Sequence, residues 1–97
     1  MAVVFHIPGF LRTHTSGRSQ VKIDGSPATA GDALRSLCAM HPGVRDRVLD
    51  DRGAVREHVN LFVGAESIRF TGGLDTAVPD GSEITIVPAI SGGRDPA

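Results

Sequence analysis

The chain has 97 residues, enough for one small domain with a single hydrophobic core. A formal net charge of -1 and only four aromatic residues, all phenylalanine, give no basic or base-stacking surface for nucleic acid. No apolar run approaches the ~20 residues that span a membrane, and one cysteine excludes an internal disulfide, so we expect a cytoplasmic protein that binds neither nucleic acid nor membrane.

The N-terminal quarter of the chain has the pattern of two β-strands. Residues 3–7 are apolar and rich in β-branched side chains, and residues 19–25 alternate between polar and apolar, with Val21 and Ile23 on one side. Residues 10–18 are polar and are expected to form a loop or an irregular hairpin. We expect the two strands to be antiparallel and half buried.

A helix is predicted over residues 29–41. Thr29 is a good N-cap, and Asp32 three residues later suits the positive end of the helix. A short second helix is expected over 44–50. The apolar face of the first helix has the spacing i, i+3, i+4, i+7, i+8 and consists of Ala30, Ala33, Leu34, Leu37 and Cys38.

Three further strands are predicted over 57–63, 68–70 and 83–89, with a turn over 79–82 before the last of them. With the short strand over 68–70 left out of the count, the order β-β-α-β-β indicates an α+β protein. One main helix would pack on one face of a mixed sheet of four to five strands. If the first and last strands both lie centrally, they run parallel.

The end of the chain differs in composition from the rest. After the last strand comes Ser91, then Gly92 and Gly93, then four more residues. Glycine adds nothing to a core and is costly to order, so we predict a domain over residues 1–90 and a flexible tail over 91–97. Without Cβ atoms, the two glycines can enter a narrow active site of another protein.

Short motifs spread over residues 3–93 resemble those of a known family. They are Ile7-Pro8, Leu11-Arg12, Val59-Asn60-Leu61-Phe62-Val63, Ile68-Arg69-Phe70, Gly73-Leu74-Asp75-Thr76, Asp80-Gly81 and Ile86-Val87-Pro88-Ala89-Ile90-Ser91-Gly92-Gly93. Together they resemble the ThiS/MoaD family of sulfur carrier proteins, with most likeness to the CysO-type members linked to cysteine biosynthesis. The resemblance implies a ubiquitin-like β-grasp fold.

The resemblance also implies a chemistry for Gly93. An E1-like adenylyltransferase/sulfurtransferase would use ATP to adenylate its carboxylate, and sulfur would then replace AMP to give a thiocarboxylate. A sulfur-accepting synthase, in the CysO-like case similar to a cysteine synthase, would take the sulfur. The chain itself would be no enzyme and would bind no cofactor, while Gly92 and Ser91 would let the tail thread into its partners.

An apolar residue is expected on the surface of the last strand. Ile84 and Ile86 should face the core, so Val87 points outward. Family members dock on the activating enzyme through an apolar patch near this position. We therefore expect Val87 at the partner interface, with Phe62 and Ile90 as further candidates.

The chain departs from the family pattern after Gly93. Residues 94–97 follow it, so Gly93 has a peptide bond and no free carboxylate. A JAMM-type metalloprotease that cuts between Gly93 and Arg94 would make the chain a precursor. The residues could also come from cloning, or the protein could be a non-catalytic binding module. A ubiquitin-like modifier joined to lysines through Gly93 fits the same tail.

Nothing in the sequence predicts a metal site or a nucleophile. The four histidines are 8, 27 and 17 residues apart, without the spacing of ligands. Cys38 lies on the apolar helix face and is expected to pack there. The final sulfur acceptor stays open among cysteine, molybdopterin, thiazole, a thiolated tRNA base and other sulfur-containing metabolites.

Overall fold

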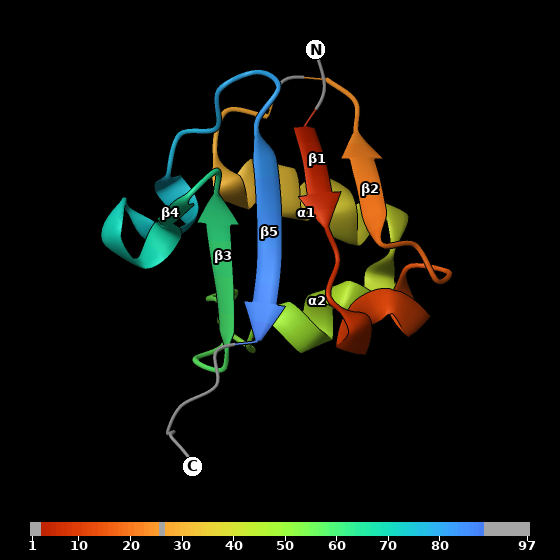
Figure 1. Ribbon diagram of the computed structural model, residues 1–97. Coiled ribbons are helices and arrows are strands. Elements are labelled where there is room, and N and C mark those ends of the chain that lie inside the picture. Colours follow the sequence, from red (N-terminus) through yellow and green to blue (C-terminus); the bar gives the residue numbers. More distant parts are fainter. Residues whose placement is uncertain (1–2, 26, 89–97) are drawn as a thin grey trace.

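One mixed β-sheet organises the chain (Figure 1). The computed structural model describes residues 3–25 and 27–88. The strands are β1 (Val3–His6), β2 (Gln20–Ile23), β3 (Val59–Val63), β4 (Glu66–Ser67) and β5 (Glu83–Pro88). Their spatial order is β2-β1-β5-β3-β4, and β1 and β5 are parallel while all other neighbours are antiparallel. The predicted α+β fold, with the first and last strands side by side in the centre, is confirmed.

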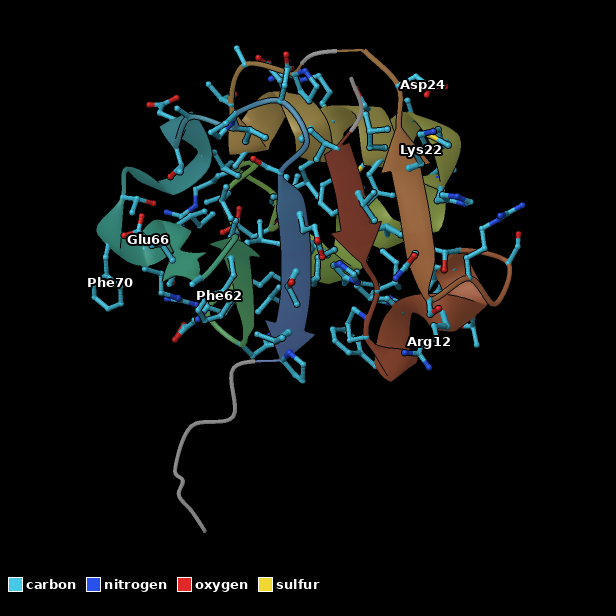
Figure 2. All side chains as sticks on the ribbon, turned by 45° about the horizontal axis from the view of Figure 1, so that its top comes forward. Arg12, Lys22, Asp24, Phe62, Glu66 and Phe70 are labelled. Atoms are coloured by element: carbon cyan, nitrogen blue, oxygen red, sulfur yellow. The ribbon has the colours of Figure 1, made fainter. Side chains whose placement is uncertain are left out.

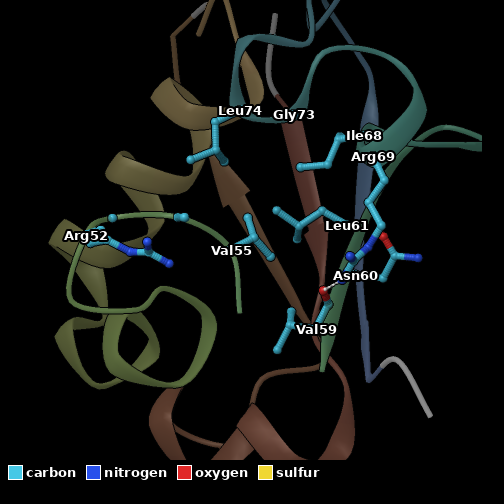
Figure 3. Close-up of a pocket in the computed structure, with 11 residues that line it drawn as sticks. Arg52, Val55, Val59, Asn60, Leu61, Ile68, Arg69, Gly73 and Leu74 are labelled. Carbon is cyan, nitrogen blue, oxygen red and sulfur yellow. Dashed lines mark hydrogen bonds between the residues drawn. The ribbon is translucent and has the colours of Figure 1, made fainter. Parts of the chain in front are cut away.

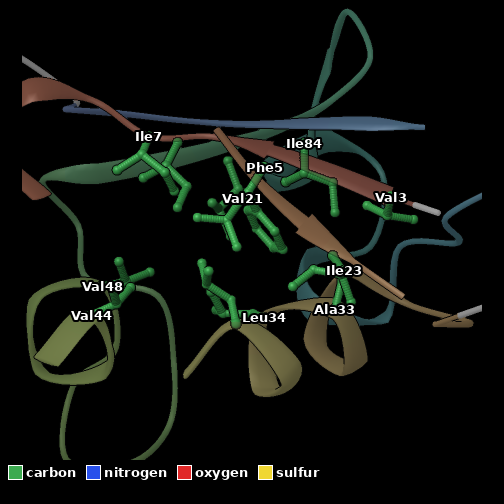
Figure 4. Packing of buried hydrophobic residues seen from close by; sticks show 14 of the residues in the cluster. Val3, Phe5, Ile7, Val21, Ile23, Ala33, Leu34, Val44, Val48 and Ile84 are labelled. Atoms are coloured by element: carbon green, nitrogen blue, oxygen red, sulfur yellow. The ribbon is translucent and has the colours of Figure 1, made fainter. Parts of the chain in front are cut away.

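Two helices cover one face of this sheet and leave the other face open (Figure 1). They are α1 (Ala30–Met40) and α2 (Pro42–Val48). Figure 4 shows Phe5 and Ile84 of the sheet packed toward Leu34 of α1, with Val44 and Val48 of α2 beside them. All five side chains are at most 1% exposed, so a single core joins the helices to the sheet.

Helix α1 begins as the sequence predicts. Thr29 is extended and its Oγ1 accepts a hydrogen bond of 3.1 Å from the backbone N–H of Asp32. The Asp32 carboxylate does not complete a capping box, since it accepts from Arg35 instead. The backbone N–H of Ala30 donates to the carbonyl of Thr76, which fixes the first turn of α1 to the segment before β5.

Replacing Thr29 by alanine is expected to lower the free energy of unfolding by about 1 kcal/mol, because a helix N–H then loses its acceptor. Urea denaturation followed by circular dichroism measures the change. Thr13→Ala serves as the matched control, since Thr13 is exposed and no hydrogen bond of its side chain is found among the described residues. An equal loss of stability in both variants would contradict the capping role.

Helix α2 starts two residues earlier than the predicted range of 44–50. Pro42 is its first residue, where the fixed φ of proline is favourable and its missing N–H costs nothing. Gly43 follows, and a Cβ on it would lie 2.7 Å from Nδ1 of His14. The ring of His14, which accepts a hydrogen bond from Nε of Arg47, therefore packs directly on the backbone of α2.

The prediction of a loop or an irregular hairpin over 10–18 is wrong in part. Residues Gly9–His14 form a 3₁₀ helix that buries Leu11 completely against the core. A 3₁₀ helix this short shows little hydrophobic periodicity, so the mostly polar sequence around Leu11 gave no signal for a helix. Thr15 ends the helix; its buried hydroxyl donates to the carbonyl of Arg18.

The prediction of a strand over 68–70 is also wrong. Strand β4 ends at Ser67, and Ile68–Phe70 form a 3₁₀ helix. The Oγ of Ser67 accepts from the backbone N–H of Arg69, which favours the turn over continued pairing. As a result Ile68 is buried, whereas Phe70 is 88% exposed.

The remaining sequence expectations concern the ends of the chain. The boundary predicted at residue 90 and the tail predicted over 91–97 lie outside the described residues and stay predictions. In the part of the chain that the structure describes, no helix is long and apolar enough to cross a membrane.

Candidate functional site

The face of the sheet that the helices leave uncovered is a candidate surface, and we call it the open face (Figure 1). Its side chains alternate along each strand with those of the core. They belong to Val4, His6, Gln20, Lys22, Asn60, Phe62, Glu83, Thr85 and Val87. Polar and charged side chains predominate, with apolar ones among them.

Two of the apolar side chains, Phe62 and Val87, lie near each other on the neighbouring strands β3 and β5. Asn60 is directly opposite Val87, and Phe62 is opposite Thr85, so Phe62 and Val87 are diagonal neighbours. Each is partly buried. We call this pair the apolar corner. The structure thus brings together two of the three residues predicted to bind a partner, while the third, Ile90, lies outside the described residues.

A hydrogen-bonded pair, His6 and Glu83, also lies on the open face. Nε2 of His6 and Oε1 of Glu83 are 2.5 Å apart, with side chains that are 32% and 65% exposed. The parallel pairing of β1 with β5 places the two residues on adjacent strands although they are 77 positions apart. The sequence analysis missed this pair, because local pattern carries no signal for contacts between distant segments.

The site of the proposed chemistry, Gly93, lies outside the described residues, as do Ser91, Gly92 and Arg94. The structure does show where the chain leaves the sheet. Pro88, at the end of β5, is paired with Val59 at the start of β3. The segment that carries the two glycines therefore begins at the edge of the open face next to the apolar corner.

Phe70 was not singled out from the sequence. Figure 2 shows its ring at the periphery of the molecule, directed away from the sheet, and it is 88% exposed. The assumed strand over 68–70 would have placed Phe70 on the same face as Ile68. An exposed ring of this size is favourable for contact with another protein.

The described residues do not include three or more histidine, cysteine, aspartate or glutamate side chains grouped to hold a metal ion. Cys38 is partly buried on α1, as its position on the apolar helix face predicts. Burial raises the pKa of its thiol, and the nearby Asp46 acts in the same direction against Arg45. The thiol is therefore protonated at neutral pH, which fits a packing role better than a nucleophilic one.

Comparison with known proteins gives a consistent result over nearly the whole chain. The model of the ThiS family matches residues 5–93. The sulfur carrier protein CysO of Mycobacterium tuberculosis is 40% identical over 95 residues, which cover 96% of this chain and all of the relative. Small archaeal modifier protein 1 of Haloferax volcanii is 36% identical over 74 residues, which cover 76% of this chain and 79% of the relative.

Solved structures show the same arrangement of strands and helices. A chain in the crystal structure of the Amycolatopsis orientalis BexX/CysO complex superimposes with a TM-score of 0.84 and 37% identity, covering 95% of this chain and all of that one. CysO of Mycobacterium tuberculosis superimposes with a TM-score of 0.83 and 39% identity, and the match covers 91% of this chain and 99% of that one. SAMP1 from Haloferax volcanii superimposes with a TM-score of 0.79 and 30% identity, and the match covers 96% of this chain and all of that one.

Proposed function

Since the chain belongs to the ThiS family, we propose that it is a sulfur carrier protein of the CysO type that works through a thiocarboxylate on Gly93. The observation that carries the proposal is the family match over residues 5–93, which extends through the two glycines. The identity of 40% with a CysO over that protein's full length supports the same role.

The chemistry needs a free carboxylate at Gly93. An E1-like enzyme would join this carboxylate to the AMP portion of ATP and release pyrophosphate, because a carboxylate is a poor electrophile without a leaving group. A sulfur nucleophile delivered by the enzyme would then attack the carbonyl carbon and displace AMP. The carrier supplies the reacting group and a docking surface, while the partner enzymes bind ATP and lower the barriers.

Because Arg94 follows Gly93, the carboxylate must first be released. We propose that a JAMM-type metalloprotease hydrolyses the bond between Gly93 and Arg94 with water and removes residues 94–97. Gly92 and Ser91 would pass through narrow channels of the protease and of the activating enzyme. The small side chains of this segment support such threading.

The apolar corner is the part of the open face that we propose to dock on the activating enzyme. Phe62 and Val87 are partly exposed apolar residues next to the point where the tail leaves the sheet. A partner that covers them while it holds Gly93 would bury apolar surface at the centre of the contact. Ile90, three residues beyond Val87, would extend the same contact.

The sulfur acceptor is proposed from the CysO likeness. A synthase similar to cysteine synthase would present an activated serine, and the carrier would deliver sulfur for cysteine. A CysO occurs in a complex with BexX in the structure from Amycolatopsis orientalis, which supports transfer to a partner enzyme. Because activation consumes ATP, we place this cycle in the cytoplasm.

A second candidate function is that of a protein modifier. Small archaeal modifier proteins 3 and 1 of Haloferax volcanii are 38% and 36% identical over 66 and 74 residues. The same adenylate on Gly93 would then be attacked by a lysine amine, which would form an isopeptide bond. The two functions share activation and differ in the nucleophile that follows.

Intact mass spectrometry of the protein isolated from its native cells tests the proposal. We expect a species that ends at Gly93, together with one in which sulfur replaces an oxygen of the carboxylate. Gly93 in isopeptide linkage to lysines of other proteins would favour the modifier. If Gly93 remains joined to Arg94 in every species while the pathway is active, the precursor scheme is wrong.

A further inference from the structure

A pocket of about 380 Å³ opens on the flank of the molecule, outside the apolar corner (Figure 3). It lies between β3, the loop that leads into β3, and the two short 3₁₀ helices that follow β4, Ile68–Phe70 and Gly73–Asp75. Its apolar lining consists of Val55 and Leu74, which are partly buried, and of the core residues Val59, Leu61 and Ile68, which are at most 3% exposed. This volume and lining are typical of sites that bind a small apolar group.

The pocket exists because the sheet edge is incomplete at this point. Strand β4 pairs only with Phe62 and Val63 of β3. The first residues of β3 pair with β5 on one side, and in the described part of the chain no strand covers their other side. Ile68 turns into a 3₁₀ helix instead of extending β4, which leaves the pocket between this helix and the first residues of β3.

Both charged residues that line the pocket are arginines. Figure 3 shows Arg52 and Arg69 on opposite sides of it. Nη2 of Arg69 donates to the carbonyls of Glu57 and Val59, at 3.0 and 2.9 Å. These bonds fix the guanidinium, whose Nε and Nη1 donate to no other described residue.

Arg52 belongs to a well-defined turn. Asp50 accepts hydrogen bonds from the backbone N–H groups of Ala54 and Arg52, which lower the pKa of its carboxyl group. The Asp50 carboxylate lies 3.5 Å from the Arg52 guanidinium, whose side chain is 87% exposed. This contact is weak and solvated, so Arg52 can bind a second carboxylate.

The pocket is connected to the predicted docking surface and to the tail. Asn60 lines the pocket and is also the cross-strand partner of Val87 in the apolar corner. Val59 lines it as well and is paired with Pro88, where β5 ends. Gly93 is five residues further along and reaches at most roughly 17 Å from Pro88. A protein that holds Gly93 therefore lies close to both surfaces.

We propose that this pocket receives an apolar side chain of the activating enzyme, which carries acidic residues next to that side chain, and that it forms a second docking point beside the apolar corner. The inference rests on the proposed carrier function. The chemistry of the pocket indicates this occupant. The apolar lining suits an apolar side chain, and the guanidiniums of Arg52 and Arg69 favour a carboxylate on either side of it.

Binding of short peptides tests the pocket without any enzyme. The probes are acetyl-Glu-Leu-Glu-amide and acetyl-Lys-Leu-Lys-amide, titrated into the ¹⁵N-labelled chain. We expect saturable amide shifts at Gly53, Leu61, Ile68 and Gly73 with the acidic peptide and weaker binding of the basic one. Equal binding of both peptides, shifts confined to other regions, or no saturable shift would overturn the proposal.

The variant Arg52→Glu is expected to weaken the acidic peptide severalfold and leave the fold intact, since the side chain is exposed. Arg35→Glu is its matched control. Arg35 is 79% exposed on α1 and also pairs with an aspartate, Asp32, but it does not line this pocket. If both variants reduce peptide affinity alike, a general charge effect explains the binding and the proposal fails.

A second experiment measures adenylation kinetics with the activating enzyme and uses the chain ending at Gly93 as substrate. Arg52→Glu should raise the KM for the carrier roughly tenfold and leave kcat unchanged, because like charges would then meet at the contact, while Arg35→Glu keeps the KM. An unchanged KM for Arg52→Glu would overturn this partner assignment. If no chain is activated at all, the carrier function is wrong, and the peptide titration alone still decides whether the pocket binds an apolar side chain that has acidic neighbours.

Discussion

A chain shortened to end at Gly93 is expected to be adenylated by the E1-like enzyme and converted to a thiocarboxylate, whereas a chain that continues beyond Gly93 should not react. In the longer chain the Gly93 carbonyl belongs to an amide with Arg94, so no carboxylate oxygen is present to attack ATP. Pyrophosphate exchange and intact mass after incubation with ATP and a sulfur source measure the two steps. The effect is all or none.

Controls separate the chemistry of the terminus from its passage into the enzyme. Gly92→Val in the shortened chain keeps the carboxylate of Gly93 and adds a branched side chain at the channel, so exchange should fall sharply. Incubating the longer chain with the processing protease should restore activation. Equal reaction of the longer and shortened chains would show that Gly93 is not the activated residue.

The second large effect is expected from Val87→Asp on the open face. Val87 and its diagonal neighbour Phe62 form the apolar corner, and a carboxylate placed there would be desolvated against an apolar partner surface. Loss of a central contact weakens the free energy of binding to the enzyme by about 2 kcal/mol or more. This corresponds to a roughly 30-fold higher KM for the carrier in adenylation. The kcat at saturation should change little.

Gln20→Asp is the matched control for that variant. Gln20 lies on the same face in β2 and is exposed, so the substitution adds the same charge away from the apolar corner. Thermal unfolding of both variants checks that the strands are retained, because aspartate is unfavourable in any strand. A KM for Val87→Asp no higher than that of the control would place the docking surface elsewhere.

The two proposed contacts lie on either side of the start of the tail. The apolar corner borders it on the open face, and the flank pocket borders it through Val59 and Asn60. The two kinetic tests are therefore independent, because Val87 and Arg52 lie in different surfaces. A partner that uses both would hold the carrier in one orientation, with Gly93 directed into its active site.

Local patterns predicted those elements whose stability is largely local. The face of α1 and its cap at Thr29 follow from a spacing of 3.6 residues and from hydroxyl chemistry. The inward direction of Ile84 and Ile86, and hence the outward direction of Val87, follows from strand alternation. These predictions are confirmed because each depends on residues only a few positions apart.

The local sequence pattern led to a wrong prediction for residues 68–70, because contacts with distant residues decide their conformation. Ile68-Arg69-Phe70 alternates as a strand would, yet it forms a 3₁₀ helix. Arg69 donates to carbonyls 10 and 12 residues away, and Ile68 is buried on the core side. No local signal reports such partners, so both the exposed Phe70 and the flank pocket escaped the sequence analysis.

By itself the sequence determined the order of the main elements, the buried faces of α1 and β5, and the two glycines that follow the last strand. Only the tertiary structure decided that Phe62 lies diagonally across from Val87, that His6 pairs with Glu83, and that two arginines flank an apolar pocket. The physical reason is the sheet order β2-β1-β5-β3-β4. It places segments side by side that are far apart in the chain, and short-range periodicity carries no information about such neighbours.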